Sequence, residues 1–153
     1  MGKKPPARSA DLALLSAALR HLRDAEHLAD ATTPHLSLDQ AYHLAGFAPE
    51  CARKAAIAAE WVNKPLGHDL GDDAEAVLAL ALALDPFITR YALKGWGETY
   101  PALAKWTPDC RYKMTSTFQS EQVDPLLRES RRVVEEIMAA LWADGRLPRG
   151  DVR

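Results

Sequence analysis

Four side chains in this sequence carry groups suited to binding an anion: Lys54, His68, Arg111 and Tyr112. An arginine beside a tyrosine can hold a phosphate or a carboxylate, because the guanidinium offers paired donors and the phenol adds another. A histidine oriented by a nearby carboxylate can give or take a proton near neutral pH. The sequence therefore predicts a candidate site for a phosphate, a carboxylate or another anion, and it assigns no catalytic residue.

The histidine also has a structural interpretation, which we prefer. In that interpretation the ring of His68 bonds to a backbone carbonyl and fixes a turn between two helices. Asp69 then caps the helix that follows the turn.

Glu50 decides between two interpretations of the arginine. It lies four residues before Lys54, which is the favourable order for an ion pair on one helix face. If Glu50 pairs with Lys54, Arg111 and Tyr112 are left to hold an anion. If Glu50 pairs with Arg111, the arginine locks two helices together, and this structural pairing is the outcome that we expect.

Other kinds of site find little support in the sequence. No Glu is followed by His at the spacing used in helical-bundle metal sites, and Cys51 and Cys110 lack the spacing of a zinc or redox pair. The chain also contains no Walker loop and no dinucleotide-binding glycine fingerprint. We therefore expect no metal and no cofactor.

Length and composition indicate one soluble domain. The chain has 153 residues, of which 48% are apolar, so it is long enough to bury a core without a disulfide or metal. Its formal net charge of −2 argues against binding nucleic acid through bulk positive charge. Two scattered cysteines and the lack of a secretory signal or a long apolar run predict a cytoplasmic protein that does not cross a membrane.

Apolar periodicity predicts an all-α, up-and-down bundle of four main helices plus a short one. The bundle is expected over residues 11–145, between a disordered basic tail at 1–10 and a flexible tail at 146–153. The expected helices run from Asp11 to about Ala31, from Ser37 through Val62, from Gly71 to about Leu84, from Asp85 to Gly95, and from Asp124 to Gly145.

Individual residues refine these expected helices. Ser37 and Gln40 form a capping-box pattern. Pro49 predicts a kink near Gly46 in the second helix, or two helices that meet there. Pro65 is expected to stop that helix. Residues 96–118 are expected to form an ordered, packed loop with a helical turn.

Several short motifs together resemble the HEPN family of small helical proteins from prokaryotic defence and toxin–antitoxin systems. These motifs resemble the second helix of that family, the turn after it, and an Arg-Tyr pair before the last long helix. They are Tyr42 to Phe47, Glu50 to Ala52, Lys54 with Ala55, Gly67 to Leu70, and Arg111 with Tyr112.

The resemblance implies a function but also a missing motif. RNA cleavage in that family uses an Arg and, four to six residues later, a His near the start of the last long helix, and this chain has no His after His68. Arg20 and His27 match the spacing, but they lie in the first expected helix, where a solvated face explains them. We therefore expect a non-nucleolytic module that forms a homodimer or binds a partner such as a nucleotidyltransferase-like protein. The alternative is an RNA- or nucleotide-directed toxin that uses Arg111, Tyr112, His68 and Lys54.

Overall fold

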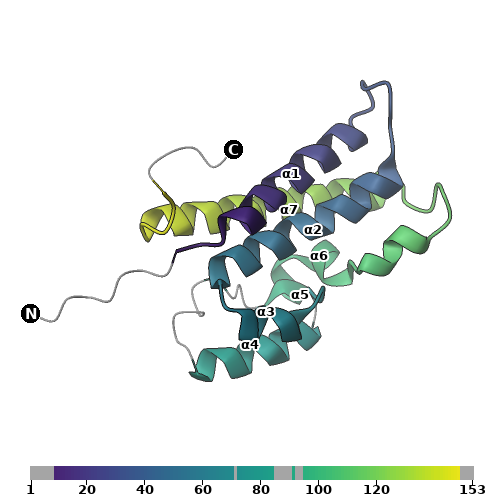
Figure 1. Ribbon diagram of the computed structural model, residues 1–153. Helices are drawn as coiled ribbons and strands as arrows, with labels where there is room; N and C mark the ends of the chain where they lie inside the picture. Colours follow the sequence, from purple (N-terminus) through teal and green to yellow (C-terminus); the bar gives the residue numbers. More distant parts are fainter. Residues whose placement is uncertain (1–8, 71, 85–90, 92–94, 149–153) are drawn as a thin grey trace, which may run out of the picture.

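A computed structural model describes residues 9–70, 72–84, 91 and 95–148, and all regular structure in these residues is helical. The predicted all-α bundle is thus confirmed (Figure 1). The elements are α1 (Leu12–Ala29), α2 (Leu38–Ile57), α3 (Glu60–Leu66), α4 (Asp72–Leu84), α5 (Trp96–Thr99), α6 (Pro101–Lys105), the 3-10 helix η2 (Pro108–Tyr112) and α7 (Ser120–Ala143).

Helix α2 is the centre of the fold and packs against both α1 and α7. Its inward stripe consists of alanines, which let neighbouring helices approach closely. These alanines are all fully buried: Ala41, Ala45, Ala48, Ala52 and Ala55. Helices α3 to α6 lie on the side of α2 away from α1, below α2 in the view of Figure 1.

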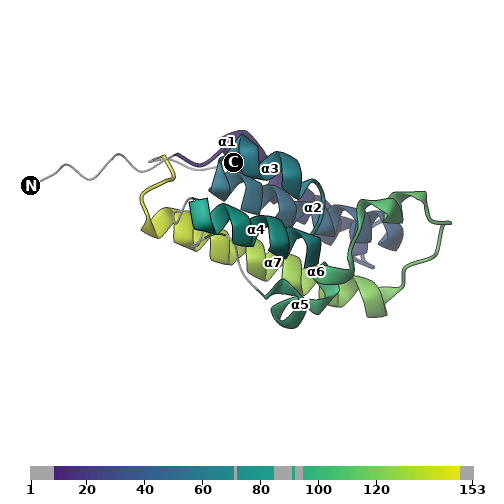
Figure 2. The same cartoon turned by 90° about the horizontal axis from the view of Figure 1, so that it is seen from below.

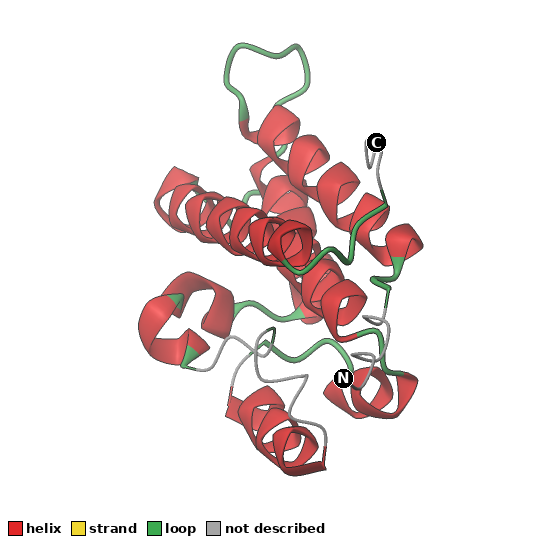
Figure 3. Cartoon of the chain, turned by 90° about the vertical axis from the view of Figure 1, so that its left-hand side faces the viewer, coloured by secondary structure: helices red, strands yellow, loops and turns green. Residues whose placement is uncertain are grey.

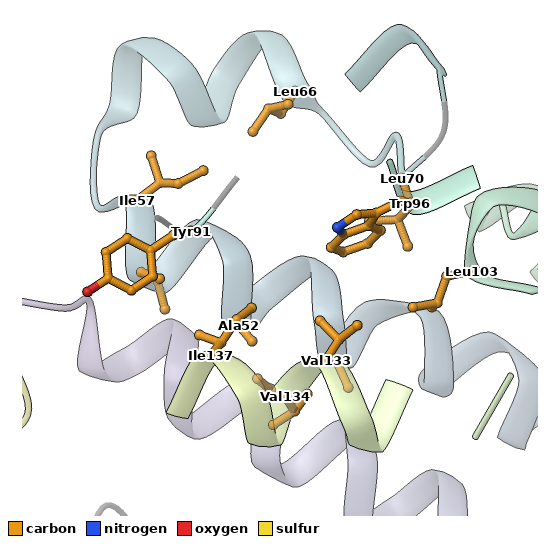
Figure 4. Close-up of a cluster of buried hydrophobic side chains, with 14 of the residues drawn as sticks. Ala52, Ile57, Leu66, Leu70, Tyr91, Trp96, Leu103, Val133, Val134 and Ile137 are labelled. Carbon is orange, nitrogen blue, oxygen red and sulfur yellow. The ribbon is translucent and has the colours of Figure 1, made fainter. Parts of the chain in front are cut away.

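The core lies where α2 and α7 meet these shorter helices. Figure 4 shows Ile57 of α2, Leu66 of α3 and Trp96 in the upper part of the cluster, and Val133 and Ile137 of α7 below them. All five side chains are at most 2% exposed. Burial of this apolar surface joins the long helices to the smaller layer.

Pro49 lies inside α2, and the helix continues through it as one element. Proline has no amide hydrogen, so it cannot donate to the carbonyl of Ala45 four residues before. The hydroxyl of Ser130 on α7 donates to that carbonyl instead, at 2.7 Å, and Ser130 is completely buried. A neighbouring helix thus satisfies the acceptor that the proline leaves open.

Gly46 lets an indole lie against α2. A Cβ atom at this position would lie 2.1 Å from atoms of the Trp106 ring, so only glycine fits without a shift. The indole Nε1 of Trp106 also donates to the carbonyl of Tyr42, at 3.1 Å. The segment after α6 is therefore fixed against the first half of α2.

The end of α2 differs from the prediction. The helix ends at Ile57, Ala58 adopts a left-handed conformation with φ 48°, and Val62 belongs to the separate helix α3. The side-chain amide of Asn63 donates to the carbonyl of Lys54, at 3.1 Å, and so satisfies one of the last carbonyls of α2. The predicted stop after Pro65 agrees closely with the structure, because α3 ends at Leu66.

Other helix ends agree with the prediction in part. The carboxylate of Asp11 caps α1 as expected and accepts the amides of Ala13 and Leu14, both at 3.1 Å. Ser37 precedes α2 without a side-chain cap, so the predicted capping box is wrong. Helix α7 begins at Ser120 rather than near Asp124.

A different capping box explains the early start of α7. The Gln119 side chain accepts a backbone amide of the first turn, and the Gln122 side chain accepts the amide of Gln119, at 2.9 Å. At the other end, Gly145 follows the cap with φ 65°, close to the predicted C-terminus. Its amide and that of Arg146 donate to the carbonyls of Trp142 and Leu141, which is a Schellman motif.

Two residues that were assigned to the tails belong to the packed part of the molecule. Ala10 is 6% exposed and Arg146 is 3% exposed, with the Arg146 guanidinium 4.7 Å from the centre of the Tyr91 ring. The predicted helix over 85–95 falls mostly outside the described residues. Among the described residues, no helix is both long and apolar enough to span a membrane.

Candidate functional site

Glu50 lies at the centre of the candidate site. Its side chain is only 4% exposed, and one oxygen, Oε1, lies 2.7 Å from Lys54 Nζ and 2.9 Å from His68 Nδ1. Glu50 thus pairs with Lys54, which was the alternative to the expected pairing with Arg111. The structure adds His68, which comes from the turn after α3 and not from α2.

Helix α2 holds this turn at three consecutive residues. Lys54 Nζ donates to the carbonyl of Gly67, Glu50 bonds to the ring of His68, and Arg53 donates to the carbonyl of Asp69, at 2.8 Å. We call Glu50, Arg53, Lys54 and residues 67–69 the turn cluster. Because Glu50, Arg53 and Lys54 lie three and four residues apart, one face of α2 carries all three contacts.

Arg53 is the member of the turn cluster that sequence reasoning missed. It is 1% exposed, and its guanidinium lies 4.7 Å from the centre of the Trp96 ring. Burial lowers the pKa of Arg53 to about 10, although the charges of Glu50, Asp69 and Glu75 oppose the shift. Its position three residues after Glu50 was the available signal, because that spacing places both side chains on the same helix face.

Phe47 joins the turn cluster to two further histidines and an indole. Its ring centre lies 5.6 Å from that of His68, 5.0 Å from His43, 5.8 Å from His21 and 4.9 Å from Trp106. Phe47 lies one turn before Glu50 on α2. The ring of His68 is therefore held from one side by a carboxylate and from another by an aromatic edge.

The other two histidines are poor candidates for holding an anion by charge. Burial, followed by the charge of Arg20, lowers the pKa of His21 below its ordinary value of 6.5. Burial and the charge of Arg111 likewise lower the pKa of His43, whose two ring nitrogens are covered. Both imidazoles are thus neutral at physiological pH.

His68 differs from its neighbours because its side chain is 55% exposed. An ionised carboxylate can only accept hydrogen bonds, so Glu50 fixes the hydrogen of a neutral His68 on Nδ1. The second ring nitrogen, Nε2, is then an acceptor. This pairing of a buried carboxylate with a half-exposed imidazole can orient a proton-transfer group, and it can equally fix a turn.

Arg111 and Tyr112 lie apart from the turn cluster. They end the 3-10 helix η2, where the Arg111 guanidinium lies 4.7 Å from the centre of the Tyr112 ring and Tyr112 is 74% exposed. The influence of Arg111 on the pKa of His43 places it near that residue, which precedes Glu50 by about 10 Å along α2.

The expected pairing of Arg111 with Glu50 is therefore wrong. In the part of the chain that the structure describes, the ion pairs of Glu50 are with Lys54 and His68. The physical reason is that α2 and the turn already supply two donors to the carboxylate, while η2 meets α2 farther toward its N-terminus. The four predicted site residues thus form two separate pairs, Lys54 with His68 and Arg111 with Tyr112.

Cysteine and metal chemistry receive no support from the described residues. Burial, together with the charge of Glu50, raises the pKa of Cys51 to about 11, and burial also raises the pKa of Cys110. Both thiols are therefore protonated and weakly nucleophilic at neutral pH. Among the described side chains, no group of three or more potential ligands could hold a metal ion.

Comparison with protein-family models, with curated proteins and with solved structures gives no match for the chain.

Proposed function

We propose that this chain is a non-nucleolytic, HEPN-like helical module of a prokaryotic toxin–antitoxin or defence-type system, acting in the cytoplasm. It works by pairing with a second copy or with a partner such as a nucleotidyltransferase-like protein. The observation that carries the proposal is the shared carboxylate oxygen of Glu50, which engages both Lys54 and His68.

These contacts commit the candidate reactive groups to holding the turn. The Lys54 side chain is 14% exposed and donates both to Glu50 and to the carbonyl of Gly67. Moving its ammonium to an incoming phosphate would leave the buried carboxylate with less compensation, which is costly in a dry site. Arg111, the cation expected to assist, lies in η2, which meets α2 nearer to the N-terminus of α2 than Lys54 does. The arrangement supports a scaffold more than a reaction centre.

A second candidate function is recognition of RNA or a nucleotide. Its support is the 55% exposure of His68 together with the carboxylate at its Nδ1, which is an arrangement that orients Nε2 for a ligand. Arg111 and exposed Tyr112 would supply a separate contact for a phosphate or base. In this function Lys54 and His68 act on one part of the ligand, and Arg111 and Tyr112 act on another.

Two measurements on wild type and His68→Ala separate these functions. For the scaffold, we expect no cleavage of single-stranded RNA without metal ions, and His68→Ala should lower the melting temperature because a buried carboxylate loses a partner. Added nucleotide should not raise the melting temperature of the wild type. His35→Ala, which removes an exposed histidine from the α1–α2 connection, is the control and should leave stability unchanged.

The opposite results would support the ligand-directed function. Stabilisation of the wild type by added nucleotide, lost in His68→Ala or Arg111→Ala, would identify a binding site. Metal-free RNA cleavage that His68→Ala abolishes and His35→Ala retains would overturn the non-nucleolytic proposal.

A further inference from the structure

Helix α4 is apolar on its outward face as well as on its inward face. Its inward residues Ala74, Leu78 and Ala81 are each 2% exposed, whereas Leu80 and Leu84 are 67% and 68% exposed. The exposed side chains follow helical spacing and form what we call the α4 outer face: Ala76, Ala79, Leu80, Ala83 and Leu84.

None of the five residues that define the outer face is charged. The one charged side chain described in α4 is that of Glu75. Its Oε1 accepts the amides of Gly95 and Trp96, at 2.8 and 3.3 Å. Seen from below, α4 lies in front of α2 and α7 (Figure 2). A helix that is apolar on two opposite faces is ordinarily covered on both, and contiguous exposed apolar patches mark interaction sites.

We propose that the α4 outer face pairs with the same face of a second copy of this chain, with the two α4 helices antiparallel. The inference rests on the proposed function as a pairing module and assigns its surface. Leu80 lies midway between Ala76 and Leu84, so a two-fold axis at Leu80 brings Leu84 of each copy over Ala76 of the other. Large side chains then meet small ones at both ends of the contact.

Charge also favours a second copy over an unrelated charged helix. Two such faces meet without burying an unpaired charge, whereas a partner with charged groups on its contacting face would have to bury them without a counter-charge. The outer face extends about 12 Å from Ala76 to Leu84, so one helix pair buries less than the roughly 1,600 Å² of a standard interface. We therefore expect a weak dimer that forms only at high chain concentration.

Sedimentation velocity over a range of concentrations tests this surface. Leu80→Glu should raise the dimer dissociation constant by about 100-fold, because two carboxylates would face one another across the axis. Leu36→Glu is the matched control, since Leu36 is also an exposed leucine, at 49%, but lies in the α1–α2 connection. Both variants should keep the wild-type circular dichroism and melting temperature of the monomer.

A mixing experiment tests the two-fold arrangement itself. Leu80→Glu and Leu80→Lys should each be monomeric alone and should form a heterodimer when mixed, because opposite charges then meet at the axis. Leu80→Cys should form an intermolecular disulfide under mild oxidation, and Leu36→Cys should not. The cross-link remains informative if the charged variants fold poorly.

The outcomes distinguish this inference from the proposed function. A wild-type dimer that survives Leu80→Glu, or that Leu36→Glu weakens equally, would overturn the assignment to α4 and leave the scaffold proposal in place. A wild-type chain that stays monomeric throughout would overturn both this inference and self-pairing. Cleavage of RNA would overturn the proposed function without bearing on the dimer.

Discussion

At the scale of single residues, the buried carboxylate of Glu50 sets the energetics of the turn cluster. Its Oε1 takes both donors, while Oε2 is covered and has no hydrogen-bond partner in the described structure. Taking a carboxylate out of water is expensive, and only close opposite charges and hydrogen bonds offset that cost. The contribution of each charged group in the turn cluster to stability therefore depends on the presence of the others.

Replacing Glu50 by alanine should destabilise the chain strongly. Glu50→Ala leaves the largely buried Lys54 ammonium without its counter-charge, and we expect a loss of about 3–5 kcal/mol in the free energy of unfolding, measured by urea denaturation. The matched control is Glu60→Ala. Glu60 makes the same kind of i,i+4 pair with Lys64, but both side chains are more than 75% exposed.

The control should lose less than about 1 kcal/mol, because water and salt screen an exposed pair. Equal losses of stability in Glu50→Ala and Glu60→Ala would show that water reaches Glu50 in solution. That result would contradict the mutual dependence of the charged groups in the turn cluster.

Local spacing predicted only part of this cluster. Glu50 and Lys54 are four residues apart on one helix, so their pairing could be predicted from sequence. His68 lies 18 residues from Glu50. Its ring reaches Glu50 only because the chain breaks between α2 and α3, and no local sequence signal predicts that break. The partner of Arg111 was mispredicted for a similar reason, since the path of η2 along α2 is set by tertiary packing.

At the scale of elements, the long helices satisfy one another's backbone. Pro49 leaves the carbonyl of Ala45 open, and Ser130 of α7 donates to it inside the core. The contact fixes the register of α7 along α2, because a hydroxyl must lie opposite one particular carbonyl. The small-residue stripe of α2 alone would tolerate sliding.

A double-mutant cycle on this contact should be strongly non-additive. Ser130→Ala should cost about 1–3 kcal/mol, because a buried carbonyl loses its donor. In the Pro49→Ala background the restored amide of residue 49 can donate to Ala45, so the same serine replacement should cost much less. Urea denaturation of the four chains measures the coupling, with Ser120→Ala, an exposed serine of α7, as the control.

Additive effects in that cycle would mean that Ser130 stabilises the core by packing alone.

Helix existence was easier to predict than helix ends. Apolar periodicity is a local signal, and it predicted all four of the helices α1, α2, α4 and α7. The carboxylate of Asp11 likewise predicted the start of α1. The end of α2 falls between alanines, which are the best helix formers, so propensity favours continuation. The break at Ala58 depends instead on the packing of α3 and on the Asn63 side chain, which are not local signals.

At the scale of the whole molecule, carboxylates join the smaller helices to the central ones. Glu75 of α4 accepts two amides at the start of α5, Glu129 of α7 accepts the amide of Leu103 at 2.9 Å, and Glu136 of α7 accepts the Tyr100 hydroxyl at 2.6 Å. Protonation of such carboxylates weakens hydrogen bonds that they accept as anions. Acid should therefore loosen the attachment between these layers.

The pair of Tyr100 and Glu136 predicts a loss of stability both at low pH and at high pH. The hydrogen bond from Tyr100 lowers the pKa of Glu136 below 4.5, so its contribution is present above pH 4.5 and is lost as the pH falls through the folded-state value. Burial, followed by the bond to Glu136, raises the pKa of Tyr100 from 10.0 to about 12. The unfolded tyrosine then ionises first, so stability falls as the pH rises from 10 to about 12.

Tyr100→Phe tests both effects: it removes the alkaline one and reduces the acid one, because Arg132 also lowers the pKa of Glu136. The free energy of unfolding of this variant should change less than that of the wild type at each extreme of pH. Tyr112→Phe, at a tyrosine that is 74% exposed, should keep the wild-type pH profile. A Tyr100→Phe profile parallel to that of the wild type would contradict the assigned hydrogen bond.

The three-residue grip of α2 on residues 67–69 also determines where the chain tolerates a change of length. One inserted residue there would move Gly67, His68 and Asp69 out of register with Lys54, Glu50 and Arg53 together, because each contact assumes the spacing of its neighbours. The connection from Ala31 to Leu36 is largely exposed, and added residues there cost mainly loop entropy. Natural relatives of this chain should therefore vary in length at that connection and keep the turn at a fixed length. Engineered tags should likewise be tolerated at the connection and not in the turn.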